Sequence, residues 1–296
     1  MNDEITVSIL LVCYNAKRYL EGCLNSIREK VTAPYEVILL DNASVDETAD
    51  FVQSQFSWVR FLRSDENLGF TKGNNFAARH ARGKYYLLLN PDTVLLSDIM
   101  PALQLLEQDR TIGIAGGQAI RGTGETGICT GWFPTALRLW RVKNLWMQPT
   151  VPYGSPESAA YKVEWLEGAF LMTRAENWRA LGGLDEYYFL GIDDIDFCRA
   201  TSDRGLAIVQ CAKVRYIHFG GYTPSRAKFV YAGFRHYHKK FSSPAHRLLA
   251  ELVLRVGLWL RIAIFGVWYG LTRNQTIGER WRSCVETNKL WPQMAP

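Results

Sequence analysis

The first hundred residues alternate between two hydrophobic patterns. Continuous apolar runs, typical of buried strands, occupy residues 6–12, 36–41, 58–62 and 84–90. Apolar residues spaced three or four apart, which indicate amphipathic helices, fall within residues 16–30, 43–56 and 71–83. Ser44 and Glu47 have the spacing of a capping box and predict a helix start. This alternation predicts an α/β fold with a doubly wound, mainly parallel sheet.

The second half of the chain is less regular. We expect a helix at residues 97–109 and strands at residues 111–117, 163–174 and 213–217. The last of these strands ends at His218, a residue with metal-ligand chemistry. Residues 121–162 are rich in Gly, Pro and Thr, and their pattern gives no assignment.

Composition excludes some classes of protein. A hydrophobic fraction of 48% in 296 residues is enough for a substantial core. The net charge of +5 is diffuse and comes with no recognition motif, so we do not expect nucleic-acid binding. The six cysteines form no C-x-x-C pair, and the acidic N-terminus lacks the basic segment of a signal peptide. We therefore expect a reduced, cytoplasmic setting.

Polar residues close three of the expected strands: Tyr14-Asn15, Asp41-Asn42 and Asn90-Pro91-Asp92. Each could be a turn former, but three in register favour a nucleotide-type site at the carboxyl edge of the sheet. Pro91 ends the ladder and would hold Asp92 just past the edge. A carboxylate there could bind Mg²⁺ or Mn²⁺ against a diphosphate, or it could cap the following helix.

The stretch GIDDIDFCRATSDRG, residues 191–205, places three aspartates within four positions. If the stretch is helical, Asp193 and Asp196 share one face and Asp194 points elsewhere. Taken alone, the run is typical of an acidic first turn that complements the helix dipole. Catalysis by a carboxylate is the alternative interpretation.

Taken together, these segments resemble glycosyltransferase family 2, the inverting transferases of GT-A fold, and within it the rhamnosyltransferase-like members. The resemblance runs through VSILLVCYN, EVILLDNASVDET, DENLGFTKGNN, YLLLNPDT, WLEGAFLMTR and GGLDEYYFLGIDDIDFCRA to His218. It implies a GT-A catalytic domain over residues 1–241, followed by a helical extension over residues 242–296. Order and spacing make the match specific, although no single segment would be.

The resemblance also implies roles for individual residues. Tyr14, Asn15 and Asp41 would line the nucleobase pocket, with Asp41 accepting a hydrogen bond from a uracil or thymine N–H. Three further residues would lie near the ribose or diphosphate: Asn67, Lys72 and Asn75.

Asp92 matches the last Asp of the family's D-x-D metal motif, and Asn90 replaces the first. His218 resembles the histidine that completes the metal site in some relatives, although a satisfied strand-end histidine is the alternative. The implied cofactor is Mg²⁺ or Mn²⁺, which would neutralise charge on the leaving diphosphate.

The family's catalytic E-D pair corresponds to Asp193-Asp194. We assign Asp194 as the base that takes the acceptor hydroxyl proton, and Asp193 as an orienting group. Asp193 in place of Glu leaves that division open. The family's acceptor-side segment corresponds to Trp165, Glu167 and Gly168, with plain strand packing the alternative for Trp165.

Residues 246–271 form an apolar helix with charges confined to one face about 120° wide. The charged residues are Arg247, Glu251, Arg255 and Arg261. A membrane span would bury two arginines, so we expect a helix lying in the membrane interface with Trp259, Phe265 and Trp268 toward lipid. The upstream cluster FRHYHKKF, residues 234–241, could meet anionic headgroups. Packing against the catalytic domain or a second subunit, as in a homodimer, is the alternative.

These implications combine into one hypothesis. The protein would transfer a sugar, favoured as rhamnose from dTDP-rhamnose over a UDP-linked donor, to a lipid-linked saccharide acceptor during cell-surface polysaccharide synthesis. It would lie peripherally on the inner face of the cell membrane. One rival is a sugar-phosphate nucleotidyltransferase, although CYNAKRYL lacks the Gly-rich, Arg-containing loop which that class needs. The other is a non-catalytic nucleotide-sugar-binding module.

Overall fold

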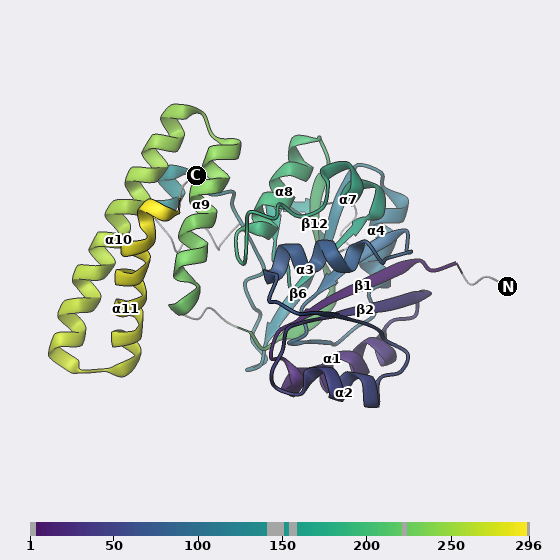
Figure 1. The fold of residues 1–296 in the computed structure, drawn as a ribbon. Coiled ribbons are helices and arrows are strands. Elements are labelled where there is room, and N and C mark those ends of the chain that lie inside the picture. Colours follow the sequence, from purple (N-terminus) through teal and green to yellow (C-terminus); the bar gives the residue numbers. More distant parts are fainter. Residues whose placement is uncertain (1–3, 141–150, 154–158, 221–223, 295–296) are drawn as a thin grey trace. The chain divides into compact units, whose positions relative to one another are not determined.

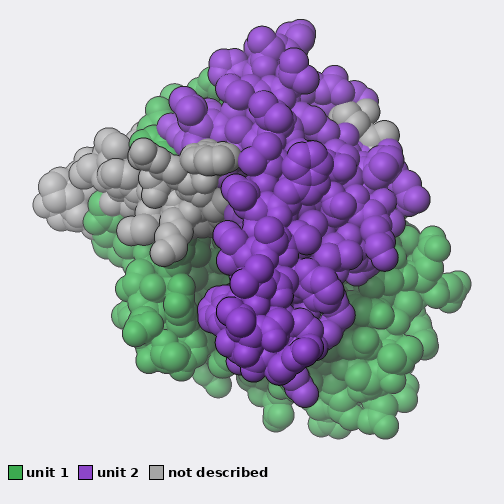
Figure 2. Space-filling view, turned by 90° about the vertical axis from the view of Figure 1, so that its left-hand side faces the viewer, with its two compact units in different colours: residues 1–132, 146–189, 193–220 green, residues 133–145, 190–192, 221–296 purple. Residues whose placement is uncertain are grey.

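The computed structural model describes residues 4–140, 151–153, 159–220 and 224–294. The chain forms two compact units (Figures 1 and 2). The sheet unit comprises residues 1–132, 146–189 and 193–220, and the helical unit comprises residues 133–145, 190–192 and 221–296. The helical unit thus begins before the expected boundary at residue 241. The division into a catalytic domain of residues 1–241 and an extension of residues 242–296 stays a prediction.

Up to residue 89 the sheet unit alternates strands and helices along the chain, as expected. Its first half contains β1 (Val7–Cys13), α1 (Lys17–Lys30), β2 (Tyr35–Asn42), α2 (Thr48–Gln55), β3 (Arg60–Ser64), α3 (Gly69–Ala78), β4 (Tyr85–Leu89), β5 (Thr93–Leu95) and α4 (Met100–Gln108). Its second half contains β6 (Ile112–Arg121), β7 (Thr130–Gly131), β8 (Val151–Tyr153), β9 (Ala160–Val163), β10 (Trp165–Leu166), β11 (Phe170–Arg174), α7 (Ala175–Leu181), α8 (Asp193–Asp203) and β12 (Ala207–His218).

The main sheet has the order β3-β2-β1-β4-β11-β6-β12-β9-β8, with β5 paired to β12. Strands β1 to β4 pair in parallel, and β6 pairs in parallel with β12. Strand β11 runs antiparallel to β4 and β6. Its first residue, Phe170, therefore lies opposite Leu89, the last residue of β4. The predicted mainly parallel α/β sheet is confirmed. Its carboxyl edge collects the ends of β1, β2, β4 and β12 together with the start of β11.

Helices cover both faces of the sheet (Figure 1) because successive strand residues point to opposite sides. Ile9 and Leu11 of β1 belong to one core cluster with Leu20 and Leu24 of α1, and all four are fully buried. On the other face α3 approaches so closely that a Cβ at Gly73 would lie 2.8 Å from Val12. Each fully buried Leu or Ile contributes about 1.5–3 kcal/mol to stability.

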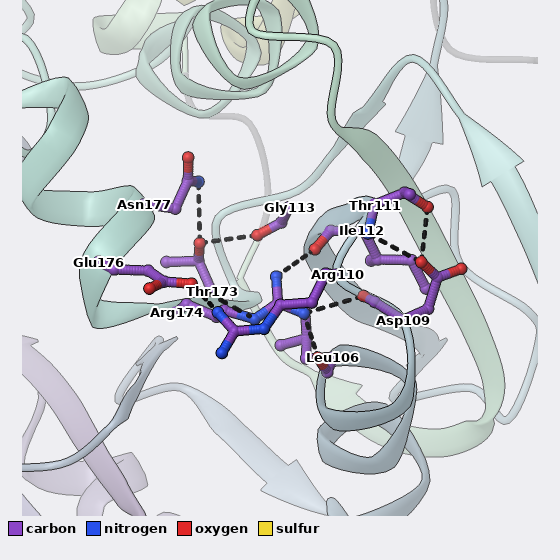
Figure 3. A network of polar contacts seen from close by, with 10 residues as sticks. All are labelled: Leu106, Asp109, Arg110, Thr111, Ile112, Gly113, Thr173, Arg174, Glu176 and Asn177. Atoms are coloured by element: carbon purple, nitrogen blue, oxygen red, sulfur yellow. Dashed lines mark hydrogen bonds and ion pairs between the residues drawn. The ribbon is translucent and has the colours of Figure 1, made fainter.

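A buried arginine joins α4, β6 and β11 beneath the sheet (Figure 3). Arg174, only 6% exposed, donates through Nη1 to the Ile112 carbonyl at 2.5 Å and through Nη2 to the carbonyls of Asp109, at 2.8 Å, and Leu106. Glu176 lies 3.9 Å from its Nε. The Leu106 carbonyl lies in the last turn of α4, where acceptors have no helical partner, and the guanidinium supplies a donor to it.

Two local expectations were wrong. Residues 163–174 do not form one strand, because the chain breaks at Glu164 and turns at residues 167–169, so that β9, β10 and β11 are separate. Ser44 does not form a capping box, since its Oγ accepts a hydrogen bond from the Asn15 amide at 2.9 Å and α2 begins only at Thr48.

The helical unit consists of α5 (Ala136–Trp140), η2 (Pro224–Arg226), α9 (Ala227–Phe241), α10 (Pro244–Thr272), α11 (Gln275–Leu290) and η3 (Trp291–Gln293). Ser243 caps the start of α10 and Asn274 that of α11, and Arg273 between them takes a left-handed backbone with φ of 53°. The resulting antiparallel hairpin of α10 and α11 is held by Tyr269 stacked on Trp281, with ring centroids 6.0 Å apart.

The charged residues of α10 share one face, as expected, but this face is turned inward. Glu251 binds Arg235 of α9, and Arg261 donates to the Tyr231 hydroxyl at 3.2 Å. Arg255 and Arg261, which an interfacial helix would keep hydrated, are only partly exposed here. The cluster at residues 234–241 is also mostly internal, since Arg235 and His238 are buried and only its two lysines are exposed.

Candidate active site

The turn after β1 is locked to the loop after β2. Asn15 has a left-handed backbone with φ of 52°, its amide donates to Ser44 Oγ, and its Oδ1 accepts from the Val45 amide at 2.9 Å. Tyr14 beside it is 52% exposed. The first two predicted nucleobase residues therefore lie on a rigid turn at the carboxyl edge, and one of them presents an aromatic ring to solvent.

Asp41 is fully buried at the end of β2 and has one unused oxygen. Oδ1 accepts from the Ser44 amide at 3.1 Å, whereas Oδ2 has no hydrogen-bond partner among the residues that the structure describes. The nearest cation is Arg63 Nε, 3.8 Å from Oδ2, beyond hydrogen-bond distance. A buried carboxylate oxygen without a donor is costly unless a ligand supplies one. The sequence analysis missed Arg63, although β3 pairs with β2 so that Arg63 lies directly opposite Asp41.

The segment after β3 is fixed by amide side chains. Asn42 donates to Asn67 Oδ1 at 3.0 Å and accepts from the Leu68 amide, and Asn67 Oδ1 also accepts from the Gly69 amide. Asn75 is buried, and its side chain binds both the carbonyl and the amide of Leu184. Lys72 is exposed. Asn67 and Asn75 thus hold loops in place, and the predicted role of these three residues near the ribose or diphosphate stays a prediction.

His218 lies between two carboxylates at the end of β12. Its Nε2 is 3.5 Å from Asp92 Oδ1 and its Nδ1 is 3.2 Å from Glu167 Oε1. Asn90 Nδ2 is also 3.5 Å from Nε2. Main-chain pairing sets this geometry, because β5 directly after Asp92 pairs with β12 and the Phe219 amide donates to the Asp92 carbonyl at 2.9 Å.

The electrostatics of His218 reflect its two neighbours. Burial alone would lower the pKa of the imidazole, but hydrogen bonds to Asp92 and Glu167 and their negative charges raise it to about 10. In the absence of a metal ion, His218 therefore carries a positive charge at neutral pH. These contacts are compatible with both predicted roles of His218. One is a metal ligand, and the other is a strand-end histidine satisfied by its neighbours.

Asp194 is the second residue of α8 and is held by main-chain donors. Oδ2 accepts from the Gly168 amide at 3.1 Å and Oδ1 from its neighbour Ile195 at 2.8 Å. Burial raises the pKa of the Asp194 carboxyl to about 6, and the charge of Glu167 adds to the rise. Phe70, which the sequence analysis missed, lies on the other side, since a Cβ at Gly168 would be 3.5 Å from both Phe70 Cζ and Asp194 Cβ.

The other acidic and aromatic candidates lie deeper. Asp193 is 4% exposed, and Asp196 accepts a hydrogen bond from the Tyr188 hydroxyl at 2.8 Å, which agrees with its expected structural role. Trp165 is 2% exposed, and its indole donates to the Trp132 carbonyl at 3.1 Å. These contacts fit the packing alternative for Trp165, and its assignment to the acceptor side stays a prediction.

Five of the predicted residues form a chain of contacts along the carboxyl edge. Asp92 contacts His218, His218 contacts Glu167, and Gly168 next to Glu167 holds Asp194. Asp41 belongs to the same edge, because β2 and β4 both pair in parallel with β1 and Asp41 lies opposite Cys13, the last residue of β1. The Glu167 link was not foreseen, since sequence patterns do not show that β11 starts at this edge.

The donor set can be tested against the implied divalent cation. Among the described residues no group of three or more His, Cys, Asp or Glu side chains could hold an ion. Asp92 and His218 nevertheless offer two donors to one space, and the absence of a side chain at Gly220 keeps it open, because a Cβ there would lie 2.3 Å from Asp92 Oδ2. Oxygen and imidazole ligands suit Mn²⁺ or Mg²⁺ when substrate phosphates complete the coordination.

The sheet order and the carboxylate-lined edge define a GT-A glycosyltransferase fold. A crystal structure of GalNAc-T7 with UDP, GalNAc and Mn²⁺ superposes with a TM-score of 0.62 over 81% of this chain, at 17% identity. The chain covers 48% of GalNAc-T7. The chain belongs to glycosyl transferase family 2, whose pattern matches residues 8–170, more than half of its length.

Two relatives show how far the similarity extends. The chain is 24% identical over 248 residues to an N-acetylglucosaminyl-diphospho-decaprenol L-rhamnosyltransferase of Mycobacterium tuberculosis, covering 76% of this chain and 79% of that protein. It is 28% identical over 95 residues to the teichoic acid poly(glycerol phosphate) polymerase of Staphylococcus epidermidis, covering 31% of this chain but only 13% of the polymerase. None of the described helices is long and apolar enough to cross a membrane.

Proposed function

We propose that the protein is an inverting glycosyltransferase that moves a sugar from a nucleotide diphosphate donor to a hydroxyl of a lipid-linked saccharide. The favoured donor is dTDP-rhamnose, on the analogy of the mycobacterial relative's printed activity. One observation carries the proposal. Asp194, whose carboxyl pKa is raised to about 6, lies at the carboxyl edge of the sheet, as do Asp92 and His218, which contact each other.

Asp41 would recognise the base of the donor. Its Oδ2 lacks a donor in this structure and is suited to accept the ring N–H of uracil or thymine. Tyr14 is exposed beside it and could stack on the base, because an aromatic ring offers a flat apolar face.

Asp194 would act as the base of a direct displacement. As the acceptor oxygen forms its bond to the anomeric carbon, its proton passes to the Asp194 carboxylate. The bond from that carbon to the diphosphate breaks on the opposite face, and its electron pair leaves with the nucleotide. The Gly168 amide orients Asp194, and buried Asp193 would support the start of α8.

Asp92 and His218 would hold Mg²⁺ or Mn²⁺, with Asn90 nearby as a neutral hydrogen-bonding group. When bound, the ion would supply charge neutralisation for the departing diphosphate. A lipid-linked acceptor would place the protein peripherally on the inner face of the cell membrane.

The proposal is tested with donors and a matched variant. Thermal shift with UDP- and dTDP-linked sugars, with and without Mn²⁺, should identify one stabilising donor, and product analysis should show an inverted linkage. Asp92→Asn should remove the Mn²⁺-dependent part of the shift. Asp98→Asn is the control, because the Asp98 side chain accepts hydrogen bonds from Thr32 and Met100 and, within the described part of the chain, from none of the site residues. Transfer by Asp92→Asn at the wild-type rate would exclude its ligand role.

A non-catalytic binding module is the second candidate, because Asn90 replaces the first acid of the metal motif. Such a module would bind dTDP or UDP with Mn²⁺ but release no sugar. Donor hydrolysis measured without acceptor therefore separates the two.

A further inference from the structure

The outward side of α10 is apolar over more than five turns. Between Leu248 and Leu271, every residue that the structure classes as exposed is apolar or glycine. We call these residues the outer face: Leu248, Leu249, Leu252, Trp259, Leu260, Ala263, Ile264, Val267, Trp268, Gly270 and Leu271. Exposed positions of a helix in water normally carry polar or charged side chains, so this pattern is the reverse of the usual one.

Three of the four charged residues of α10 contact groups inside the helical unit. Glu251 accepts from Arg235 Nε at 2.8 Å and from the Trp291 indole at 3.1 Å. The Arg255 guanidinium lies over the Trp291 ring, 4.8 Å from its centroid. Arg261 donates to the Tyr231 hydroxyl and to the Gly257 carbonyl. Because none of the four charged residues of α10 belongs to the outer face, this face can leave water without taking a charge with it.

The net charge of residues 221–296 indicates what kind of surface would cover the outer face. Residues 221–296 contain twelve Lys and Arg against three Asp and Glu, a net charge of +9. The sheet unit contains 19 Lys and Arg against 26 Asp and Glu, a net charge of −7. Exposed basic residues lie at both ends of the outer face, Lys239 at the end of α9 and Arg273 at the end of α10. An apolar strip with basic ends matches a bilayer with anionic headgroups.

Other occupants fit less well. A second copy of the helical segment would bring a second charge of +9 to the same face, which like-charge repulsion disfavours. A protein partner would be expected to form about one hydrogen bond per 100–200 Å². The outer face offers few polar groups for this, and the Trp259 indole already donates to Asn288 at 3.1 Å.

We propose that the outer face of α10 is the membrane-binding surface of this protein, and that α10 lies flat in the headgroup region of an anionic bilayer. The helix is 29 residues, or about 43 Å, long and lies along the surface because its inner charges keep it from spanning. This inference deepens the proposed use of a lipid-linked acceptor. Its test needs neither donor nor acceptor, so the two proposals can fail separately.

The test is co-sedimentation of the full chain with vesicles of phosphatidylcholine alone and of phosphatidylcholine with phosphatidylglycerol. The double variant Leu252→Glu with Ile264→Glu puts two charges on the outer face at positions 58% and 59% exposed. The control, Leu96→Glu with Ile128→Glu, adds the same charges to exposed apolar positions of the sheet unit. We expect wild type and control to bind the anionic vesicles, and the outer-face variant to bind at least ~10-fold more weakly.

A second measurement separates insertion from simple charge attraction. All six native cysteines are buried, so an environment-sensitive dye can be attached at Ile264→Cys and, for comparison, at Glu279→Cys on α11. The emission of the dye at residue 264 should shift to the blue on anionic vesicles, and that at residue 279 should not. Circular dichroism and thermal unfolding check that each variant is folded.

Three results would overturn the inference. They are undiminished vesicle binding by the folded outer-face variant, binding without a blue shift at residue 264, and a wild-type dimer in solution that the outer-face variant turns into a monomer.

Discussion

Replacing Asp194 with Asn should make the protein inactive and, at neutral pH, more stable. The Asp194 carboxyl is partly buried, and burial raises its pKa from an ordinary 3.8 to about 6. The folded protein therefore binds this proton more tightly than the unfolded chain does. The wild type accordingly loses stability as the pH rises through the window from about 4 to about 6. The neutral Asn side chain does not titrate and avoids this loss.

The size of the effect follows from the shift. A rise of about 2 pKa units corresponds to about 3 kcal/mol at neutral pH. Asn keeps one acceptor oxygen for the two amides of Gly168 and Ile195, and losing one of these hydrogen bonds costs about 1 kcal/mol. We therefore expect Asp194→Asn to raise the free energy of unfolding by about 1–2 kcal/mol at pH 7.

Urea unfolding at pH 7 and at pH 4 measures this difference, and a transfer assay with donor titration measures function. The gain should disappear at pH 4, where the wild-type carboxyl is protonated in the folded state. Donor affinity should persist while transfer is lost, and wild-type turnover should fall as the pH drops below about 6. Asp203→Asn is the control, because Asp203 lies on the same helix, is exposed and pairs only with Arg199 among the contacts seen. A gain of equal size at both pH values, or none at pH 7, would refute the reasoning.

Three further changes test other parts of the structure. Asp41→Asn should weaken binding of UDP or dTDP by about tenfold, because the unpaired oxygen would no longer be an anionic acceptor, and titration calorimetry should detect this; unchanged affinity would argue against base recognition there. Gly220→Ala should reduce Mn²⁺-dependent donor binding but spare metal-free nucleotide binding, since a Cβ at this position collides with Asp92 Oδ2 and His218 Nε2. Arg174→Met should lower the free energy of unfolding by about 3 kcal/mol or more by leaving carbonyl oxygens unpaired, and a loss below 1 kcal/mol in urea unfolding would contradict that account.

The sequence predicted the order of strands and helices from β1 to β4, because β1, β2 and β4 are continuous apolar runs. It also predicted which residues lie at the carboxyl edge, since parallel strands all end on one side. Asp41 and Asp92 follow from this rule alone.

The contacts that join these residues could not be predicted in the same way. Glu167 reaches His218 only because β11 runs against its neighbours, and nothing in the local pattern of residues 163–174 states a strand direction. Ser44 is a second example of a contact that the local sequence does not reveal. Its hydroxyl accepts a hydrogen bond from the Asn15 amide, 29 residues away, and does not cap α2. On α10 the periodicity located the charged face correctly, but only the contacts of Glu251 with Arg235 of α9 and Trp291 of η3 show that this face turns inward.

The reversed strand β11 also has a consequence for synthesis of the chain. β4 ends at residue 89, whereas its partner β11 begins at residue 170, so one side of β4 stays without its ladder until some eighty more residues have been made. During that interval the nascent sheet exposes a hydrophobic border that can pair with other chains. We expect fragments that stop between β6 and β11 to aggregate or to be retained by chaperones, and fragments that extend through β12 to be released.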